Sequence, residues 1–519
     1  YLNKLKKYST VIVGYHKSNS NPWKSFKFKQ SELDILEKIA AQNEVLLNVF
    51  ASPYALLDVK SFTNIESVLV GYQNSSYAQE IVAQMIFGAM ETRGKLPVSI
   101  GNTFQEGTSL KSTNLMRLTY GKPESVGMDG KAFSRVDSLI QYAIEEKMTP
   151  GAQILVARYG KVVYQKSYGY HTYEKNKPVI NSDIYDLASL TKILGGVPLI
   201  MKGEEDGMFD LEDRLDKILP EFEGTNKDTL TVKEMFSHTA RLKAWIPFYL
   251  ETLDSVTHQP LPKYYSTSPN GDFSIKVAEN LFLRTDFKDS IYENIKMVEQ
   301  REKPGYKYSG LAFYIFKKYM EEQLGVGMDE VLTSEFYGPL GAETLRYNAI
   351  DEFDKDRIIP SEMDSYFRHQ KLQGTVHDMG AAMMGGVSGN AGLFANANDV
   401  GKMMQLFLQK GYYGGHRYFQ SKTMEKFNTR YYVQDSVRRG VGFDKPQLNP
   451  EVKNTCGCVS DRSFGHSGFT GTYAWADLDT GLLYVFLSNR TFPTMENNKL
   501  GEEDVRTNIQ QLVVNAIKE

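Results

Sequence analysis

Residues 185–202, YDLASLTKILGGVPLIMK, place a serine three positions before a lysine at the start of an apolar, helix-like segment. On a helix, residues three apart share a face, so the side chains of Ser189 and Lys192 can touch. A serine hydroxyl is a poor nucleophile until a base takes its proton, and a buried lysine can be that base. The stretch therefore raises the hypothesis of a Ser-Lys pair that performs acyl transfer.

The Ser-x-x-Lys pattern is weak by itself, because it arises by chance in most chains of this size. A second segment adds to it: residues 303–316, KPGYKYSGLAFYIF, carry Tyr308 between a Pro-Gly turn and an apolar helix. At such a loop tip the tyrosine hydroxyl can face Ser189, and a phenolate beside a lysine ammonium can act as a general base. The alternative is that Tyr308, one of 32 tyrosines, merely packs.

A third segment, residues 462–475 with the sequence RSFGHSGFTGTYAW, has glycines on both sides of His466 and Ser467. Glycines let another stretch of backbone approach closely. The strand that follows would present a backbone N–H which, with that of Ser189, could form an oxyanion hole. The alternative is a glycine-rich turn that leads into an edge strand.

Taken together, the segments SLTK, YS and GHSGFTG resemble the serine β-lactamase and penicillin-binding-protein superfamily, in its class C β-lactamase-like branch. The similarity runs over residues 123–519. It implies an α/β fold with an antiparallel sheet flanked by helices and a helical subdomain. The other stretches that fit are residues 150–170, 209–222, 232–242, 367–408 and 485–490.

The resemblance implies a catalytic role for three residues. Ser189 would be the acylated nucleophile, and Lys192 would help to deprotonate it. Tyr308 would be the general acid and base of the family's Tyr-x-Asn motif. No metal or organic cofactor is implied.

The resemblance also assigns the glycine-rich segment. His466, Ser467 and Gly468 fill the family's Lys-Thr-Gly triplet, and the oxyanion N–H groups would come from Ser189 and Phe469. The substrate would be a small molecule or a peptide.

Two positions depart from the family pattern. Gly310 stands where the tyrosine motif usually has an asparagine, whose side chain contacts the lysine and the substrate amide. His466 replaces a lysine that favours substrates with a carboxylate, and a histidine is neutral for much of the time near pH 7. We expect both changes to disfavour efficient β-lactam hydrolysis and to favour esters or peptides.

Hydrophobic patterns at both ends of residues 123–519 indicate one shared sheet. Residues 129–148 form an amphipathic helix pattern, and residues 151–170 read as two strands around a Tyr-Gly turn. Residues 471–490 predict another hairpin, turning at Asp-Thr-Gly, and residues 501–519 predict a closing helix. The two hairpins could therefore complete one antiparallel sheet.

Residues 1–108 have a different pattern, in which strand-like and helix-like stretches alternate. This order is typical of a mostly parallel α/β sheet. We expect the first helix within residues 29–42, with Ser31 as its N-cap. The polar residues 109–122 read as a linker to the second domain, residues 123–519.

The stretches at 46–56, 67–88 and 93–100 resemble the C-terminal α/β sandwich domain of family 3 glycoside hydrolases, closest to the β-N-acetylhexosaminidase type. That family carries its nucleophilic aspartate in a preceding barrel, which is missing here. Glycoside hydrolysis needs two carboxylates flanking the bond. We therefore assign no glycosidase activity to residues 1–108, and we expect the barrel in a longer protein.

Composition narrows the function classes. The 519 residues are 41% hydrophobic with a net charge of −3, so the chain has no nucleic-acid footprint. No apolar run reaches the roughly 18–20 residues that span a bilayer. The chain starts without methionine or a signal peptide, as expected of a fragment or processed form. Cys456 and Cys458, with one residue between them, are too close for an easy disulfide, and a disulfide framework is excluded.

Other candidate sites are weaker. His238 and His377 are expected to hold turns through hydrogen bonds. A Gly-x-Ser-x-Gly elbow and a His-Glu-x-x-His zinc motif are both absent from the sequence. Residues 245–300, rich in aromatics, either line the substrate cleft or form a surface insertion.

The leading hypothesis is a serine hydrolase that forms an acyl-enzyme with an amide or ester, with cell-wall peptide as the favoured substrate. Family resemblance places such a protein in the periplasm or another extracytoplasmic space. The rival hypothesis, based on Gly310, is a catalytically weak penicillin-binding or ligand-binding protein on the same fold.

Overall fold

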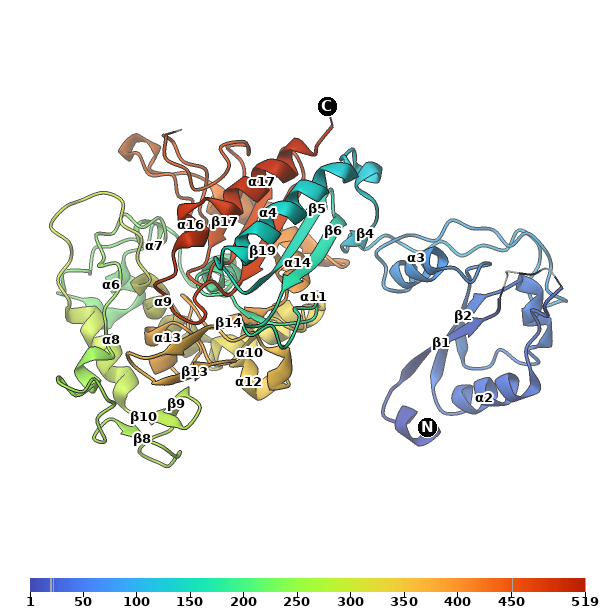
Figure 1. Ribbon diagram of the computed structural model, residues 1–519, viewed down its shortest axis with the longest axis horizontal. Coiled ribbons are helices and arrows are strands. Elements are labelled where there is room, and N and C mark those ends of the chain that lie inside the picture. The colour runs from blue at the N-terminus through green and yellow to red at the C-terminus, as the bar shows by residue number, and fades with distance from the viewer. Residues whose placement is uncertain (19–20, 22, 450, 519) are drawn as a thin grey trace. The chain divides into compact units, whose positions relative to one another are not determined.

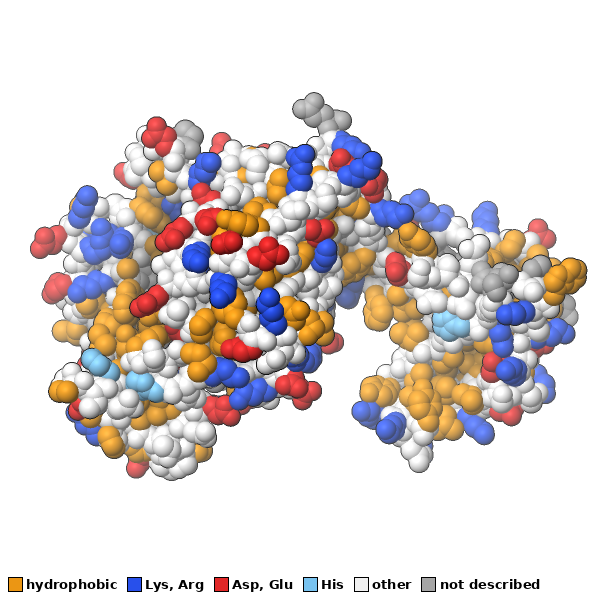
Figure 2. Space-filling model, in the orientation of Figure 1, with side chains coloured by type: hydrophobic (Ala, Val, Ile, Leu, Met, Phe, Trp, Pro, Cys, Tyr) orange, Lys and Arg blue, Asp and Glu red, His pale blue; other side chains and the backbone are white. Residues whose placement is uncertain are grey.

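The structure is a computed structural model that describes residues 1–18, 21, 23–449 and 451–518 (Figure 1). It divides into two compact units, Tyr1–Thr119 and Tyr120–Glu519. In the part of the chain that is described, no helix is both long and apolar enough to cross a bilayer. Lysine and arginine side chains are interspersed with acidic ones over the visible face of the second unit (Figure 2).

The first unit has a parallel sheet in the order β1-β2-β3, as its alternating pattern predicts. Its core joins the inward side of this sheet to the apolar face of the first long helix, through Val45, Leu47, Leu36 and Ile39. The helices and strands are α1 (Leu2–Leu5), β1 (Thr10–His16), α2 (Gln30–Ala40), β2 (Glu44–Phe50), β3 (Ile65–Val70) and α3 (Ser76–Ile86).

The expected N-cap at Ser31 is wrong. Helix α2 begins at Gln30, and its N-cap is Lys29. The Glu32 carboxylate accepts a hydrogen bond from the Lys29 backbone N–H, so an acidic side chain in the first turn satisfies the cap.

The segment after the first unit's helices lacks regular structure but is hydrogen-bonded. The Ser112 hydroxyl accepts from the Thr92 N–H at 2.9 Å, and the Leu115 N–H donates to the Gly88 carbonyl at 2.8 Å. Residues 88–115 are thus tied back onto the end of α3.

The second unit is built on an antiparallel sheet in the order β17-β18-β19-β5-β6-β4, completed by both ends of the region as predicted. The pairing of β19 with β5, with Tyr484 opposite Val156, joins the two hairpins. The strands are β4 (Thr119–Tyr120), β5 (Gly151–Arg158), β6 (Lys161–Gly169), β17 (Phe464–Ser467), β18 (Tyr473–Asp477) and β19 (Leu482–Ser488).

Helices cover both faces of this sheet. Helices α4 (Phe133–Glu145) and α17 (Val505–Asn515) lie side by side across one face (Figure 1). Their apolar stripes form a buried core with alternate strand residues, among them Ile154, Val156 and Trp475. Helix α14 (Ala397–Leu408) packs on β18, β19 and β5, and Figure 1 shows it behind the sheet, opposite α4 and α17.

The remaining elements are the helices of the helical subdomain, the short helix α16 beside α17, and several small sheets. The helices are α5 (Val197–Glu205), α6 (Leu215–Ile218), α7 (Val232–Phe236), α8 (Phe287–Met297), α9 (Leu311–Leu324), α10 (Met328–Leu332), α11 (Gly338–Leu340), α12 (Ala349–Glu352), α13 (Met379–Met383), α15 (Ser421–Asn428) and α16 (Lys499–Glu502). The short strands are β7 (Tyr185–Asp186), β8 (Tyr265–Ser266), β9 (Ile275–Ala278), β10 (Leu281–Leu283), β11 (Arg346–Tyr347), β12 (Glu362–Asp364), β13 (Gln370–Leu372), β14 (Leu393–Ala395), β15 (Tyr412–Tyr413) and β16 (His416–Arg417).

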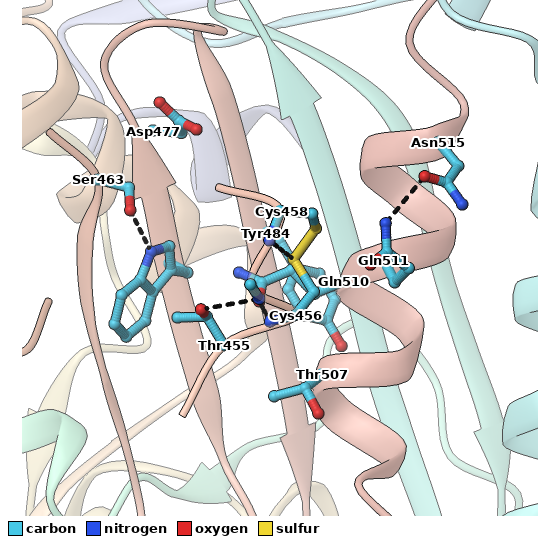
Figure 3. The surroundings of a disulfide bond; sticks show 12 residues. Thr455, Cys456, Cys458, Ser463, Asp477, Tyr484, Thr507, Gln510, Gln511 and Asn515 are labelled. Atoms are coloured by element: carbon cyan, nitrogen blue, oxygen red, sulfur yellow. Dashed lines mark hydrogen bonds between the residues drawn. A yellow bond between two sulfur atoms is a disulfide. The ribbon is translucent and has the colours of Figure 1, made fainter. Parts of the chain in front are cut away.

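The cysteine pair corrects the sequence analysis, because Cys456 and Cys458 form a disulfide (Figure 3). Gly457 between them has φ +73°, a left-handed conformation that glycine adopts without strain. The resulting turn brings the two Cα atoms to 5.2 Å, inside the range that disulfides need. The Cys456 N–H also donates to the Gln510 side chain of α17, which ties this loop to the helix.

Candidate active site

Ser189 lies at the centre of a compact polar cluster. Its hydroxyl oxygen accepts a hydrogen bond from Lys192 Nζ at 3.2 Å and another from the Tyr308 hydroxyl at 3.0 Å. Ser189 and Tyr308 are half-buried, whereas Lys192 is buried. The structure thus brings together the three residues that the sequence analysis selected, across 119 residues of chain, and leaves the serine accessible to a substrate.

Local structure explains how the serine and lysine meet. Lys192 opens a π-helix, Lys192–Gly196, that continues into α5. Such π-helical turns are rare and are frequent at functional sites. Besides Ser189, Lys192 Nζ donates a hydrogen bond of 2.9 Å to the backbone carbonyl of Asn390, so the ammonium group is fixed from two sides.

The turn that precedes the nucleophile is held by Asp186, a residue that the sequence analysis missed, and by His377, which was expected to hold a turn. Ala188 has φ +46°, an uncommon conformation for a residue with a Cβ. The Asp186 carboxylate accepts from the Ala188 N–H at 2.8 Å and from the His377 N–H at 2.7 Å. These bonds and the buried surroundings maintain a strained backbone at the site, as is common beside catalytic residues.

The glycine-rich segment packs against this turn. The Thr470 and Thr472 hydroxyls donate to the carbonyl oxygens of Asp186 and Leu187, each at 2.9 Å. A Cβ on Gly468 would lie 2.6 Å from the Leu187 carbonyl oxygen and would also overlap the Thr472 hydroxyl. Position 468 therefore requires a glycine for close backbone approach, which is the reason that the sequence analysis proposed for these glycines.

We expect Gly468→Ala to reduce kcat/KM by about 10-fold or more and to destabilise the fold by about 1–3 kcal/mol, because the added methyl must displace the nucleophile turn. Gly271→Ala is the matched control, since a Cβ at Gly271 meets nothing within 4 Å. Steady-state kinetics and thermal unfolding of both variants check this. Equal, small effects in the two variants would contradict the close-approach argument.

The backbone N–H groups of Ser189 and Phe469 were the predicted oxyanion donors. Within the described residues, neither N–H donates a hydrogen bond, so both are free to bind a substrate oxygen. Ser467 and Phe469 are exposed. The Phe469 ring contacts the Arg490 guanidinium, 4.7 Å from the ring centroid, and the His377 ring, whose centroid is 5.6 Å away. Both residues are therefore accessible to a substrate.

Two cations contact the ring of Tyr308. Lys192 Nζ lies 5.1 Å from the ring centroid, and the Arg439 guanidinium lies 5.2 Å from it. Arg439 is buried, and its Nε is 3.3 Å from Asp444, which is itself paired with Arg438. Cations against an aromatic ring favour negative charge that develops on that residue. Arg439 is a second residue that the sequence analysis missed.

His238 supports the loop that carries Tyr308. Its carbonyl oxygen accepts from the Lys307 N–H at 2.9 Å, and its ring Nδ1 accepts from the Ser309 N–H at 3.2 Å. Burial lowers the pKa of His238 well below its usual value, and the Arg439 cation adds to this. A neutral ring can accept the bond from the Ser309 N–H and hold the loop without carrying charge.

His466 is buried beside Tyr308, with ring centroids 5.7 Å apart, and its Nδ1 lies 2.7 Å from the Ser467 carbonyl oxygen. Burial, reinforced by the Arg439 cation, lowers the pKa of His466 to about 3. The ring is therefore neutral between pH 5 and 8, and it provides no titrating anchor for a substrate carboxylate.

The burial of His466 predicts that the folded protein becomes less stable at acid pH. The folded pKa of His466 lies below the unfolded value of about 6.5, so the unfolded state binds more protons between these values. Stability should therefore fall as the pH drops from about 6.5 towards 3, by at most about 1.4 kcal/mol per pH unit from this group. His466→Gln should reduce the loss of unfolding free energy between pH 7 and pH 5, with the free energy measured by a urea titration at each pH. An equal loss of unfolding free energy with pH in parent and variant would contradict a buried neutral His466.

Comparison with known proteins adds the family context. A family model described as Beta-lactamase matches residues 136–507. A Salmonella agona protein named "Putative D-alanyl-D-alanine carboxypeptidase" is 29% identical over 405 residues, which cover 74% of this chain and 88% of the relative. A protein of the same name from Salmonella typhi is 28% identical with the same coverage.

Solved structures show the same fold. EstCE1, a hydrolase with promiscuous acyltransferase activity, superposes with a TM-score of 0.53 at 18% identity, covering 74% of this chain and 98% of that one. Simvastatin synthase from Aspergillus terreus has a TM-score of 0.52 at 15% identity, with coverages of 74% and 98%.

Proposed function

The chain belongs to the beta-lactamase family and is a serine hydrolase, and we propose that it cleaves the C-terminal residue from cell-wall peptides through an acyl-enzyme at Ser189. The observation that carries this is the Ser189 hydroxyl, which accepts hydrogen bonds from both Lys192 and Tyr308. The carboxypeptidase name of the Salmonella relatives supports a peptide that ends in D-alanyl-D-alanine as the substrate.

In the proposed acylation step, Tyr308 has given up its proton, so the hydrogen bond between the two hydroxyls is reversed from that in the structure. The phenolate takes the proton of the Ser189 hydroxyl, while Lys192 and Arg439 stabilise the phenolate charge. The serine oxygen then attacks the substrate carbonyl carbon. The oxygen of the tetrahedral intermediate accepts hydrogen bonds from the N–H groups of Ser189 and Phe469. When the C–N bond breaks, Tyr308 returns the proton to the leaving amine.

Deacylation reverses these proton transfers. A water molecule replaces the leaving amine, Tyr308 takes one of its protons, and the oxygen attacks the acyl carbon. Collapse of the intermediate breaks the bond to the Ser189 oxygen, which regains a proton from Tyr308. The products are the shortened peptide acid and the free enzyme.

The preference for peptides or esters over β-lactams rests on His466. A lysine in this position would offer a fixed positive charge, whereas the buried ring of His466, with its pKa of about 3, is neutral. For the same reason we expect KM to be flat across pH 5–8.

For the first unit we propose a relationship to the C-terminal domain of family 3 glycoside hydrolases, over residues 1–108, with 109–122 as a linker and 123–519 as the hydrolase domain. The parallel order β1-β2-β3 supports this. A longer protein would then pair a sugar-cleaving barrel with the peptide hydrolase, outside the cytoplasm.

An assay panel tests the proposed substrate class. We expect release of D-alanine from an N-acylated D-alanyl-D-alanine peptide and of nitrophenol from a p-nitrophenyl ester, with slower opening of a chromogenic β-lactam. Hydrolysis of the β-lactam near 10⁶ M⁻¹s⁻¹, well inside the usual enzyme range of about 10⁴–10⁸, would reverse the preference. Ester cleavage without D-alanine release would remove the carboxypeptidase assignment and keep the serine hydrolase.

A further inference from the structure

Gly310, in the motif Tyr308-Ser309-Gly310, is not required by the backbone. Its φ of −86° and ψ of −15° are ordinary helical values, as befits the N-cap of α9. A Cβ at this position would have only ordinary contacts, and its three nearest atoms all belong to Asn390: Cβ at 3.6 Å, Nδ2 at 3.7 Å and Cγ at 3.9 Å. The space that a side chain at position 310 would enter therefore belongs to the Asn390 side chain.

Asn390 lies in the loop between α13 and β14 and is 6% exposed. Its backbone carbonyl accepts the Lys192 hydrogen bond, so this residue already helps to hold the catalytic lysine. The Ser388 hydroxyl donates to Asn390 Oδ1 at 2.6 Å, which orients the carboxamide. The oxygen is thus engaged. The donor end, Nδ2, lies next to Gly310 and also hydrogen-bonds the Tyr314 hydroxyl, which leaves the second of its two N–H groups for a ligand.

We propose that Asn390 supplies the active-site carboxamide that the Tyr308-Ser309-Gly310 motif lacks. Its Nδ2–H group donates to the carbonyl oxygen of an amide in the acyl part of the substrate, while its backbone holds Lys192. The proposal deepens the proposed function and rests on it. It narrows the substrate to acyl groups that carry an amide, such as an N-acylated amino acid.

The physical reason for selectivity is a hydrogen bond from Nδ2 that only some substrates can accept. A simple acyl group has no carbonyl for Nδ2 to contact, and sites built to hydrogen-bond a polar group discriminate strongly against substrates that lack it. A peptide acyl group fills that role.

Two esters isolate this contact. The p-nitrophenyl ester of N-acetyl-D-alanine and p-nitrophenyl propionate differ only in the acetamido group. The parent enzyme should favour the first. Asn390→Ala removes the carboxamide and keeps the carbonyl that holds Lys192, so it should lower kcat/KM for the acetamido ester by about 10-fold or more and for the propionate by less than about 3-fold. A purely structural defect would lower both equally.

Moving the carboxamide from position 390 to position 310 gives a sharper test. Gly310→Asn alone forces two carboxamides into one space and should lose activity, whereas Gly310→Ala, with a Cβ at ordinary contact distance, should not. The double variant Gly310→Asn with Asn390→Ala restores one carboxamide, so its preference for the acetamido ester should return to within about 3-fold of the parent.

The outcomes separate the two claims. If Asn390→Ala keeps the parent's ester preference, or if the double variant is no better than Asn390→Ala, the role of Asn390 is overturned. If a Ser189→Ala control still hydrolyses both esters, the proposed function itself fails. Loss of preference in Asn390→Ala with recovery in the double variant supports the inference.

Discussion

Ser189→Ala protein is expected to fold normally and to lose hydrolysis of every ester and amide substrate by on the order of 10³-fold or more. The Ser189 hydroxyl is half-exposed, and its hydrogen bonds are those from Lys192 and Tyr308. Without this hydroxyl, no oxygen remains at position 189 to form the ester bond of the acyl-enzyme. The core is untouched, so the unfolding temperature should be nearly unchanged.

Ser138→Ala is the matched control for this variant. Ser138 is exposed on α4, and its hydroxyl donates to the Ser134 carbonyl of the same helix. It should keep parent kcat/KM. Near-parent turnover by Ser189→Ala, measured with the p-nitrophenyl ester, would show that another residue is the nucleophile.

Tyr308→Phe should reduce kcat by about 10²–10⁴-fold, the usual worth of a positioned acid and base. The substitution removes the hydroxyl that donates to Ser189 and keeps the ring that Lys192 and Arg439 contact. The loss therefore reports on proton transfer more than on packing.

Tyr306→Phe is the control that separates loss of proton transfer from loss of packing around Arg439. The Tyr306 hydroxyl accepts from Arg439 Nε at 3.3 Å and makes no contact with the nucleophile. Its loss should change kcat by less than about 10-fold, because the hydrogen bond that it removes lies on Arg439, which keeps its ion pair with Asp444, and not on the nucleophile. Single-turnover kinetics of both variants measure the step directly, and equal losses would contradict a special role for Tyr308.

Much of the fold could be read from local patterns. The hairpins of β5–β6 and β18–β19 follow from apolar, β-rich runs on either side of short turns that contain Gly160 and Gly481. Helices α4 and α17 follow from apolar spacing, and both are confirmed. The parallel sheet of the first unit follows from alternation of strand and helix.

The candidate site could be predicted only in part. Ser189, Lys192 and Tyr308 were selected through family resemblance, and the structure brings them together. The residues around them could not be selected, because their contacts bridge distant parts of the chain. Asp186 accepts from an N–H 191 positions away, and the Lys192 bond to Asn390 spans 198 positions.

Two further features depend on conformation rather than on composition. The Cys456–Cys458 disulfide forms because Gly457 adopts a positive φ, which residue spacing alone does not indicate. His466 is neutral because it is buried next to Arg439. Its burial and its closeness to Arg439 both depend on the packing of β17 against the Tyr308 loop.

The central claim is that Ser189 carries the acyl group. The direct measurement is mass spectrometry of proteolytic peptides after brief reaction with a fluorophosphonate and, separately, with a labelled penicillin. We expect a single adduct on Ser189, in the peptide that contains SLTK, and no adduct in Ser189→Ala. An adduct on another serine, or no adduct with either probe, would contradict it and would favour a protein that binds its ligand without turnover.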